Sequence, residues 1–136
     1  MMLNDVKDYV SSLGLAEHVY MGKMDSKLDR SVGVYNSKNG RVYKTAIGGP
    51  HMSSYGTKQV TILIHWNRSP RETERAAKEL FEKLANASEV NVNDQKIKFI
   101  QPLTEEPVDV GTDDSGIYEM VIEAAVIYER KKVRHE

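Results

Sequence analysis

Apolar and polar residues alternate along the segment 116–129 of this chain. The even-numbered residues from Tyr118 to Tyr128 are all apolar or aromatic, whereas the odd-numbered ones include Glu119 and Glu123. Because successive side chains of a strand point to opposite faces, this pattern predicts a β-strand with one apolar face and one mixed, acidic face. At about 3.3 Å per residue the strand is roughly 40 Å long, well beyond the usual length. We therefore expect a sheet that extends beyond its own subunit, towards neighbouring subunits.

Two other segments have the spacing of amphipathic helices. The first is predicted from Leu3 to Leu13, with Asn4 or Asp5 as its N-cap. Gly14 suits the left-handed conformation that ends many helices. The second helix is predicted over residues 70–85.

The start of the second helix is the clearest local signal in the chain. Ser69 is its expected N-cap, Pro70 takes the first helical position, and Glu72 completes a capping box. Six residues at helical spacing form its expected buried stripe: Thr73, Ala76, Ala77, Leu80, Phe81 and Leu84.

Shorter runs of β-branched and aromatic residues predict further strands. They cover residues 17–23, 31–36, 41–47, 57–66, 89–92 and 96–102. Asn39-Gly40 is a strong hairpin signal and predicts a protruding hairpin between 31–36 and 41–47. Residues 103–110 are expected to be irregular and to lie at a sheet edge, and residues 111–116 to form a turn. The expected fold class is α+β: a mixed, mainly antiparallel sheet with two helices packed on it and a long C-terminal strand.

Composition narrows the possible functions. The 136 residues fit one domain, 1–136, in which 130–136 form a basic tail. A net charge of -1 argues against a protein whose main task is to hold nucleic acid. The absence of cysteine excludes disulfides, thiolate metal sites and cysteine nucleophiles. Neither a signal peptide nor an apolar run long enough to span a membrane is visible.

Catalytic and metal-binding patterns are weak. None of the four histidines has zinc-ligand spacing. His65 lies at an alternating position of a predicted central strand. This favours a residue at the margin of the core whose ring nitrogen is hydrogen-bonded. His51 is a possible general base, but no nucleophile is placed for it. The acids Asp109, Asp113, Asp114 and Glu119 suggest a calcium loop, but they lack EF-hand spacing, and Asp, Ser and Gly clusters form turns in their own right.

Several stretches together resemble a known family. They are Trp66-Asn-Arg-Ser-Pro70 before a helix, Ile97-Lys-Phe99, and Asp113-Asp-Ser-Gly-Ile-Tyr-Glu119 before the long strand. This arrangement resembles the minor capsid proteins and, through them, the tail terminator proteins of long-tailed bacteriophages. The resemblance covers roughly residues 57–130, while residues 1–56 match only in the order of their elements.

The resemblance implies a structural virion protein of the tail and neck, without catalytic, cofactor-binding or metal-binding residues. Tail terminators form a hexameric ring that stops growth of the tail tube and joins the tail to the head. The expected partners are therefore other copies of this chain, the tail tube protein and a head-closure or connector protein. DNA would pass through the ring without sequence readout, and no membrane would be involved. Assembly would take place in the cytoplasm of a bacterial host.

Contact residues can be suggested from the protruding segments. Candidates for contacts between subunits or with the tube are Asn39, Gly40, Arg41, His51, Met52 and Tyr55. Glu119 and Glu123 are candidates for acids that line the ring lumen or an interface. The segment 48–56 is either a contact loop or a solvent loop. Alternative functions are a head-completion or connector protein of the neck and, more remotely, a small hydrolase that uses His51 and the acids of 109–114.

Overall fold

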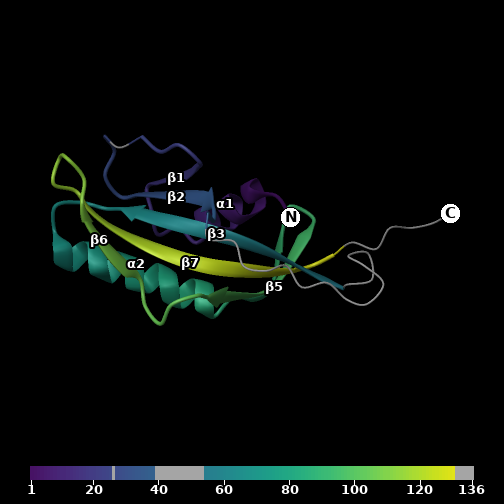
Figure 1. Ribbon diagram of the computed structural model, residues 1–136. Helices are drawn as coiled ribbons and strands as arrows, with labels where there is room; N and C mark the ends of the chain where they lie inside the picture. The colour runs from purple at the N-terminus through teal and green to yellow at the C-terminus, as the bar shows by residue number, and fades with distance from the viewer. Residues whose placement is uncertain (26, 39–53, 131–136) are drawn as a thin grey trace.

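The computed structural model describes residues 1–25, 27–38 and 54–130. The helices and strands of this part are α1 (Leu3–Ser12), β1 (His18–Met21), β2 (Ser31–Asn36), β3 (Tyr55–His65), α2 (Pro70–Ala85), β4 (Ser88–Val92), β5 (Gln95–Pro102), β6 (Val108–Thr112) and β7 (Tyr118–Glu129) (Figure 1). The predicted α+β class is confirmed.

One sheet contains all seven strands of the described part, in the order β1-β2-β3-β7-β5-β4. β6 also pairs with β7, beyond the end of β5. The β1–β2 pair is parallel and every other pair is antiparallel, so the predicted mixed, mainly antiparallel sheet is confirmed. β7 has 12 residues and pairs with the full length of the 11-residue β3. These two strands form the long central pair of the sheet.

The expected hairpin partner, residues 41–47, lies outside the described residues, so the hairpin stays a prediction. β2 pairs with β1 on one edge and with β3 on the other.

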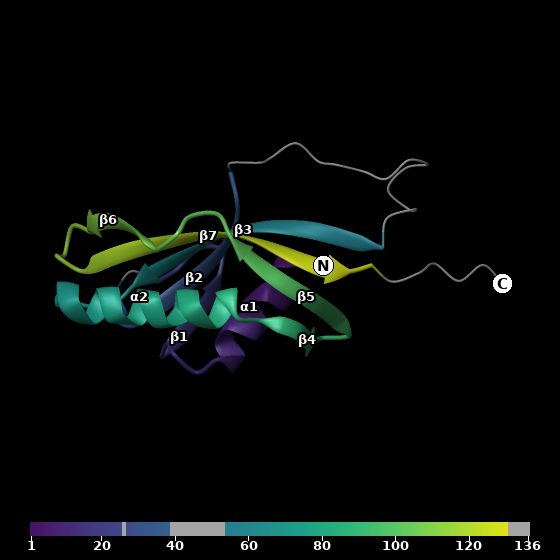
Figure 2. The same ribbon diagram turned by 90° about the horizontal axis from the view of Figure 1, so that it is seen from below.

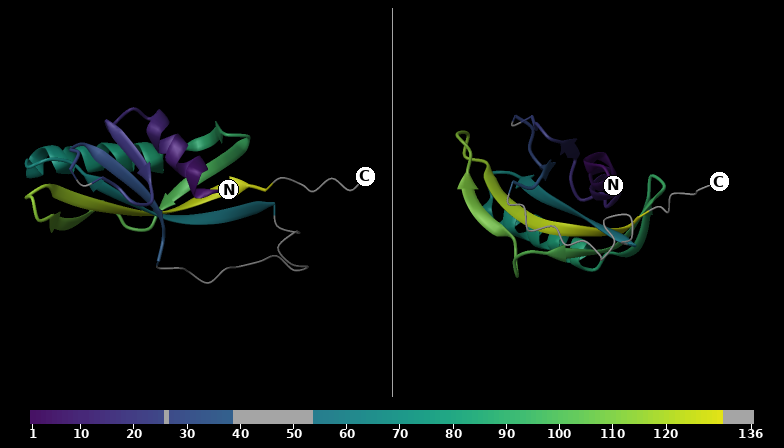
Figure 3. Two further views of the ribbon diagram at one scale, coloured as in Figure 1. Left: turned by 90° about the horizontal axis from the view of Figure 1, so that it is seen from above. Right: turned by 45° about the vertical axis from the view of Figure 1, so that its right-hand side comes forward.

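Both helices lie on the same side of the sheet, which curls around them (Figures 2 and 3). They share one apolar core with the sheet. On α1 the core residues are Val6, Tyr9 and Val10; on α2 they are Ala77, Leu80 and Leu84. The strands contribute the residues of one face, which in β7 are Ile122, Ala124 and Val126. The apolar face predicted for the C-terminal strand is therefore the face that packs against the helices.

Local hydrogen bonds fix the start of α2 almost as the sequence predicts. The Ser69 hydroxyl accepts from the backbone N–H of Glu72 at 3.2 Å. A capping box would also have the Glu72 carboxylate accept from the backbone N–H of Ser69. That part of the prediction is wrong, because this N–H donates to the Asn67 side chain at 2.9 Å. The Glu72 carboxylate instead accepts from the Asn67 amide at 2.6 Å. Asn67 thus takes the place that a capping box gives to the glutamate.

Replacing Ser69 by alanine is expected to lower the free energy of unfolding by about 1 kcal/mol, because an orphan N–H of the first turn loses its acceptor. Chemical denaturation measures the loss. Ser115→Ala, at an exposed turn position, is the matched control and should change stability little. Equal losses in the two variants would contradict the assignment of Ser69 as a cap.

The start of α1 differs from the prediction. Asn4 and Asp5 lie within the helix, and Met2 is the N-cap. The Asp5 carboxylate accepts from the Met2 backbone N–H at 2.9 Å, so it secures the helix start from its third position. Gly14 has a φ of 69°, which confirms its left-handed role after the helix.

The segment before β7 is more ordered than the sequence predicts. β6 occupies Val108–Thr112, where the sequence predicts irregular chain and the beginning of a turn. A register irregularity between Asp109 and Gly111 interrupts its pairing with β7, and Gly111 has a φ of 89°. Such a bulge lets a glycine-containing segment continue as a strand.

Candidate functional site

The sheet face turned away from the helices carries a row of polar side chains from β3 and β7. The strand register places Thr61 opposite Glu123 and His65 opposite Glu119. The Thr61 hydroxyl lies 2.9 Å from both carboxylate oxygens of Glu123, and the Ser37 hydroxyl donates to the same carboxylate at 3.3 Å. Glu123 is half-buried, and its carboxylate is hydrogen-bonded within its own subunit.

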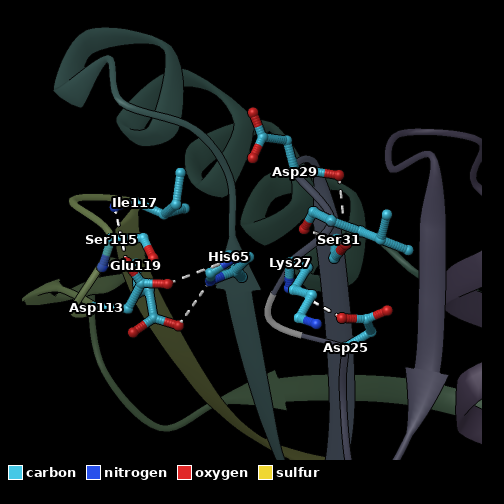
Figure 4. A network of polar contacts seen from close by, with 10 residues as sticks. Asp25, Lys27, Asp29, Ser31, His65, Asp113, Ser115, Ile117 and Glu119 are labelled. Atoms are coloured by element: carbon cyan, nitrogen blue, oxygen red, sulfur yellow. Dashed lines mark hydrogen bonds and ion pairs between the residues drawn. The ribbon is translucent and has the colours of Figure 1, made fainter.

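His65 is fully buried, at 0% exposure, beside two carboxylates. Its Nδ1 lies 3.0 Å from the Oε2 atom of Glu119, and its Nε2 lies 3.8 Å from the Oδ2 atom of Asp113 (Figure 4). The two carboxylate side chains are 20% exposed. The predicted role of His65, a satisfied residue at the edge of the core, is confirmed.

Asp113 organises the turn that leads into β7. Its Oδ1 atom accepts from the backbone N–H groups of Ser115 and Ile117, each at 2.9 Å. The hydrogen bond from Ile117 is the main cause that lowers the pKa of Asp113 below its ordinary value, and His65 lowers it further. Asp109 plays a similar part, accepting from Gly111 at 2.8 Å. These bonds support the turn interpretation of the acidic cluster, and within the described residues no group of three or more side chains has the arrangement of a metal site.

Asp113 should make stability depend on pH in the acid range. Because its pKa is lower in the folded state than the ordinary value of 3.8, the unfolded chain binds this proton more readily. The stabilisation is therefore complete above about pH 4 and is lost as the pH falls through the folded-state pKa.

We expect Asp113→Asn to flatten the fall of unfolding free energy between about pH 5 and pH 2, because asparagine keeps an acceptor but does not titrate. Urea unfolding at a series of pH values measures the slope. Asp114→Asn, at the exposed neighbouring position, should keep the slope of the unaltered chain. If Asp113→Asn also keeps that slope, the turn hydrogen bonds do not stabilise the ionised form.

The structure describes only one of the predicted contact residues outside β7. Tyr55 begins β3 with 53% of its surface exposed. The ammonium group of Lys98 lies 5.9 Å from the centre of the Tyr55 ring. The other candidates, Asn39, Gly40, Arg41, His51 and Met52, lie outside the described residues.

Sequence reasoning missed an exposed apolar edge. Val108 and Val110 of β6 are 44% and 50% exposed, and every residue of β6 is exposed. Phe99 of β5 is 47% exposed. The alternation Val108-Asp109-Val110 is the signal that could have revealed the strand. The two prolines of the segment, 102 and 107, obscured it.

Comparison with protein families decides the class of this protein. The family described as bacteriophage tail terminator protein matches residues 3–130, nearly the whole chain. The chain belongs to the bacteriophage tail terminator family. No curated protein sequence matches it.

Membership of the tail terminator family makes the protein a structural component of the phage tail. The family also suggests contacts with tail components and a place in the virion. Across the described residues, neither helix has the length and apolar character needed to cross a membrane.

Proposed function

We propose that this protein is the tail terminator of its phage: a hexameric ring at the end of the tail tube that stops tube growth and joins the tail to the head. The family match over residues 3–130 carries the proposal. Residues 1–136 act as one domain in it, which fits the single apolar core that joins both helices to the sheet.

The distribution of the helices supports a specific orientation in the ring. Because α1 and α2 cover one face of the sheet, the other face is left for the lumen or for a neighbouring subunit. This is the face that carries Glu119 and Glu123. An acidic lumen would repel the phosphate backbone, so that DNA slides through and does not stick.

The hydrogen bonds of the polar row affect the negative charge of that face. The imidazole of His65 contacts Glu119, and two hydroxyls bond to Glu123. Both carboxylates are thereby held in place, with only part of each open to solvent. In our proposal they give the lumen a fixed, moderate negative potential.

The partners follow from the role. Copies of this chain form the ring, the tail tube protein binds one side of it, and a head-closure or connector protein binds the other. The exposed Tyr55 and the residues 39–41, 51 and 52 are proposed contacts with a neighbouring subunit or with the tube.

Native mass spectrometry together with negative-stain electron microscopy tests the proposal. We expect a species of six subunits and images with six-fold symmetry, either for the protein alone or after mixing with tail tubes. A strict monomer at all concentrations and in the presence of tubes would contradict the ring.

A further inference from the structure

A groove runs between α2 and the segment that leads into β6, at the end of the molecule where β7 begins. We call it the α2–β6 groove. Residues 70–82 of α2 form one wall, residues 104–109 form the other, and Tyr118–Met120 form the floor. Its volume is about 680 Å³, which is within the range that accommodates a ligand or a short peptide segment.

The α2–β6 groove combines apolar surface with an excess of acids. Phe81, Val108 and Met120 contribute apolar side chains, and Lys78 is the single basic residue among the described residues of the lining. Five acids line it, Glu74, Glu82, Glu105, Glu106 and Asp109, besides Glu119, whose carboxylate contacts His65 on the other face of the sheet. Glu74, Glu82, Glu105 and Glu106 are exposed, and within the described chain none of them forms an ion pair.

The wall formed by β6 also has an open edge. Among the described strands β6 pairs with β7 alone, which leaves its other edge without a strand. Val108 and Val110 of the same strand expose about half of their surface. Edges of this kind are usually covered, because their unpaired backbone groups and apolar side chains favour pairing with another chain. The edge is a second reason, independent of charge, to expect a bound segment.

The sequence contains a segment of complementary charge directly after β7. Residues 131–136 include Lys131, Lys132 and Arg134 against a single acid, Glu136. They lie outside the described residues. Their charge is opposite to that of the groove lining, and a basic segment is the partner that four exposed carboxylates would attract.

The segment cannot reach the groove floor of its own subunit. Arg134 is five residues beyond Glu129, so it lies at most about 18 Å from it. Met120 on the floor is nine residues before Glu129 in the same strand, a separation of roughly 30 Å. Figure 2 shows the same relation, with the C-terminal end of β7 and β6 at opposite ends of the molecule. Residues 131–136 can therefore reach the floor of the α2–β6 groove only from another copy of the chain.

We propose that the α2–β6 groove of one subunit binds Lys131, Lys132 and Arg134 of the next subunit. The contact is head-to-tail, because it joins opposite ends of two copies, and such contacts close into a ring when the rotation between copies permits. The inference rests on the proposed ring and names the surfaces that hold it together.

Charge reversal tests the contact in the full-length protein. The tail variant is Lys131→Glu/Lys132→Glu/Arg134→Glu, and the groove variant is Glu74→Lys/Glu106→Lys. Each should raise the dissociation constant of the assembly by about tenfold or more, since facing charges become alike. The two sets combined in one chain should restore most of the affinity. The control is Glu17→Lys/Glu79→Lys, which reverses two exposed acids outside the groove and should have little effect.

A peptide experiment separates this inference from the ring itself. A fluorescent peptide of residues 127–136 is titrated against the tail variant, whose own basic residues are reversed. We expect binding that weakens with salt and that the groove variant abolishes when it is combined with the tail variant.

The outcomes are distinguishable. Rings that form equally well in the tail variant, without peptide binding, would overturn the groove contact and leave the proposed function standing. Peptide binding to the groove by a protein that never forms rings would support the contact and contradict the ring. Neither rings nor peptide binding would overturn both.

Discussion

Replacing Ile122 by alanine is expected to lower the free energy of unfolding by about 2–5 kcal/mol, because a large buried side chain is removed and a cavity remains. Ile122 is 0% exposed in the middle of β7, opposite the equally buried Ile62 of β3. It belongs to the core that joins both helices to the sheet. A cavity here weakens both the packing of the central strand pair and the packing of the helices on it.

The matched control for this prediction is Ile127→Ala. Ile127 lies on the same strand but on the opposite face, and it is only half-buried. Its loss should be clearly smaller, because less apolar area is removed from contact. Guanidinium unfolding compares the two variants. Both are measured at one fixed protein concentration, so that any contribution from subunit association is the same for each. Equal losses would mean that the two faces of β7 are equally covered, contrary to the one-sided core described above.

His65 and Glu119 are expected to be coupled by about 1–3 kcal/mol in a double-mutant cycle of His65→Ala and Glu119→Ala. The imidazole is completely buried, and its Nδ1 atom lies 3.0 Å from the carboxylate. Removing either partner leaves the other partly desolvated without its hydrogen bond, so the second replacement costs less than the first. Denaturant unfolding of the four proteins gives the coupling free energy.

An exposed pair provides the comparison. Arg30 and Glu17 lie 3.4 Å apart with side chains 51% and 60% exposed. Their coupling should be below about 0.5 kcal/mol, because water screens the pair and both side chains lose freedom in forming it. If both cycles give the same value, burial adds nothing to the His65–Glu119 contact.

The sequence predicted those parts of the fold that depend on local pattern. The alternation of residues 118–128 predicted the core face of β7 and its end at Glu129, with a start two residues too early, and Ser69-Pro70 predicted the start of α2. These signals are decided by neighbours within a few residues, through strand alternation and helix capping.

Features that depend on distant partners were beyond local pattern. The pairing of His65 with Glu119 arises from the register between β3 and β7, so the sequence showed an alternating histidine and an alternating glutamate without joining them. The hydrogen bond at the helix cap has a similar origin. The side chains of Asn67 and Glu72 compete for the backbone N–H of Ser69, and Asn67 is the one that accepts it.

The candidate contact surfaces were predicted least completely. Glycine, proline and asparagine residues indicated turns and loops in the segment around 39–56, but they do not indicate what such a segment contacts. The α2–β6 groove is formed by a helix and by a strand that lie far apart in the sequence, and it exists only because β6 returns to pair with β7. No single stretch of residues carries that information.

Imaging of tail tubes tests the tail terminator account most directly. Tubes assembled from the phage's tail tube protein are mixed with gold-labelled protein and examined by electron microscopy, and tube lengths are measured with and without it. The account predicts label at one end of each tube, six-fold symmetry in end-on views and an arrest of further growth. Label spread along the tubes, or tubes that keep growing in its presence, would contradict it.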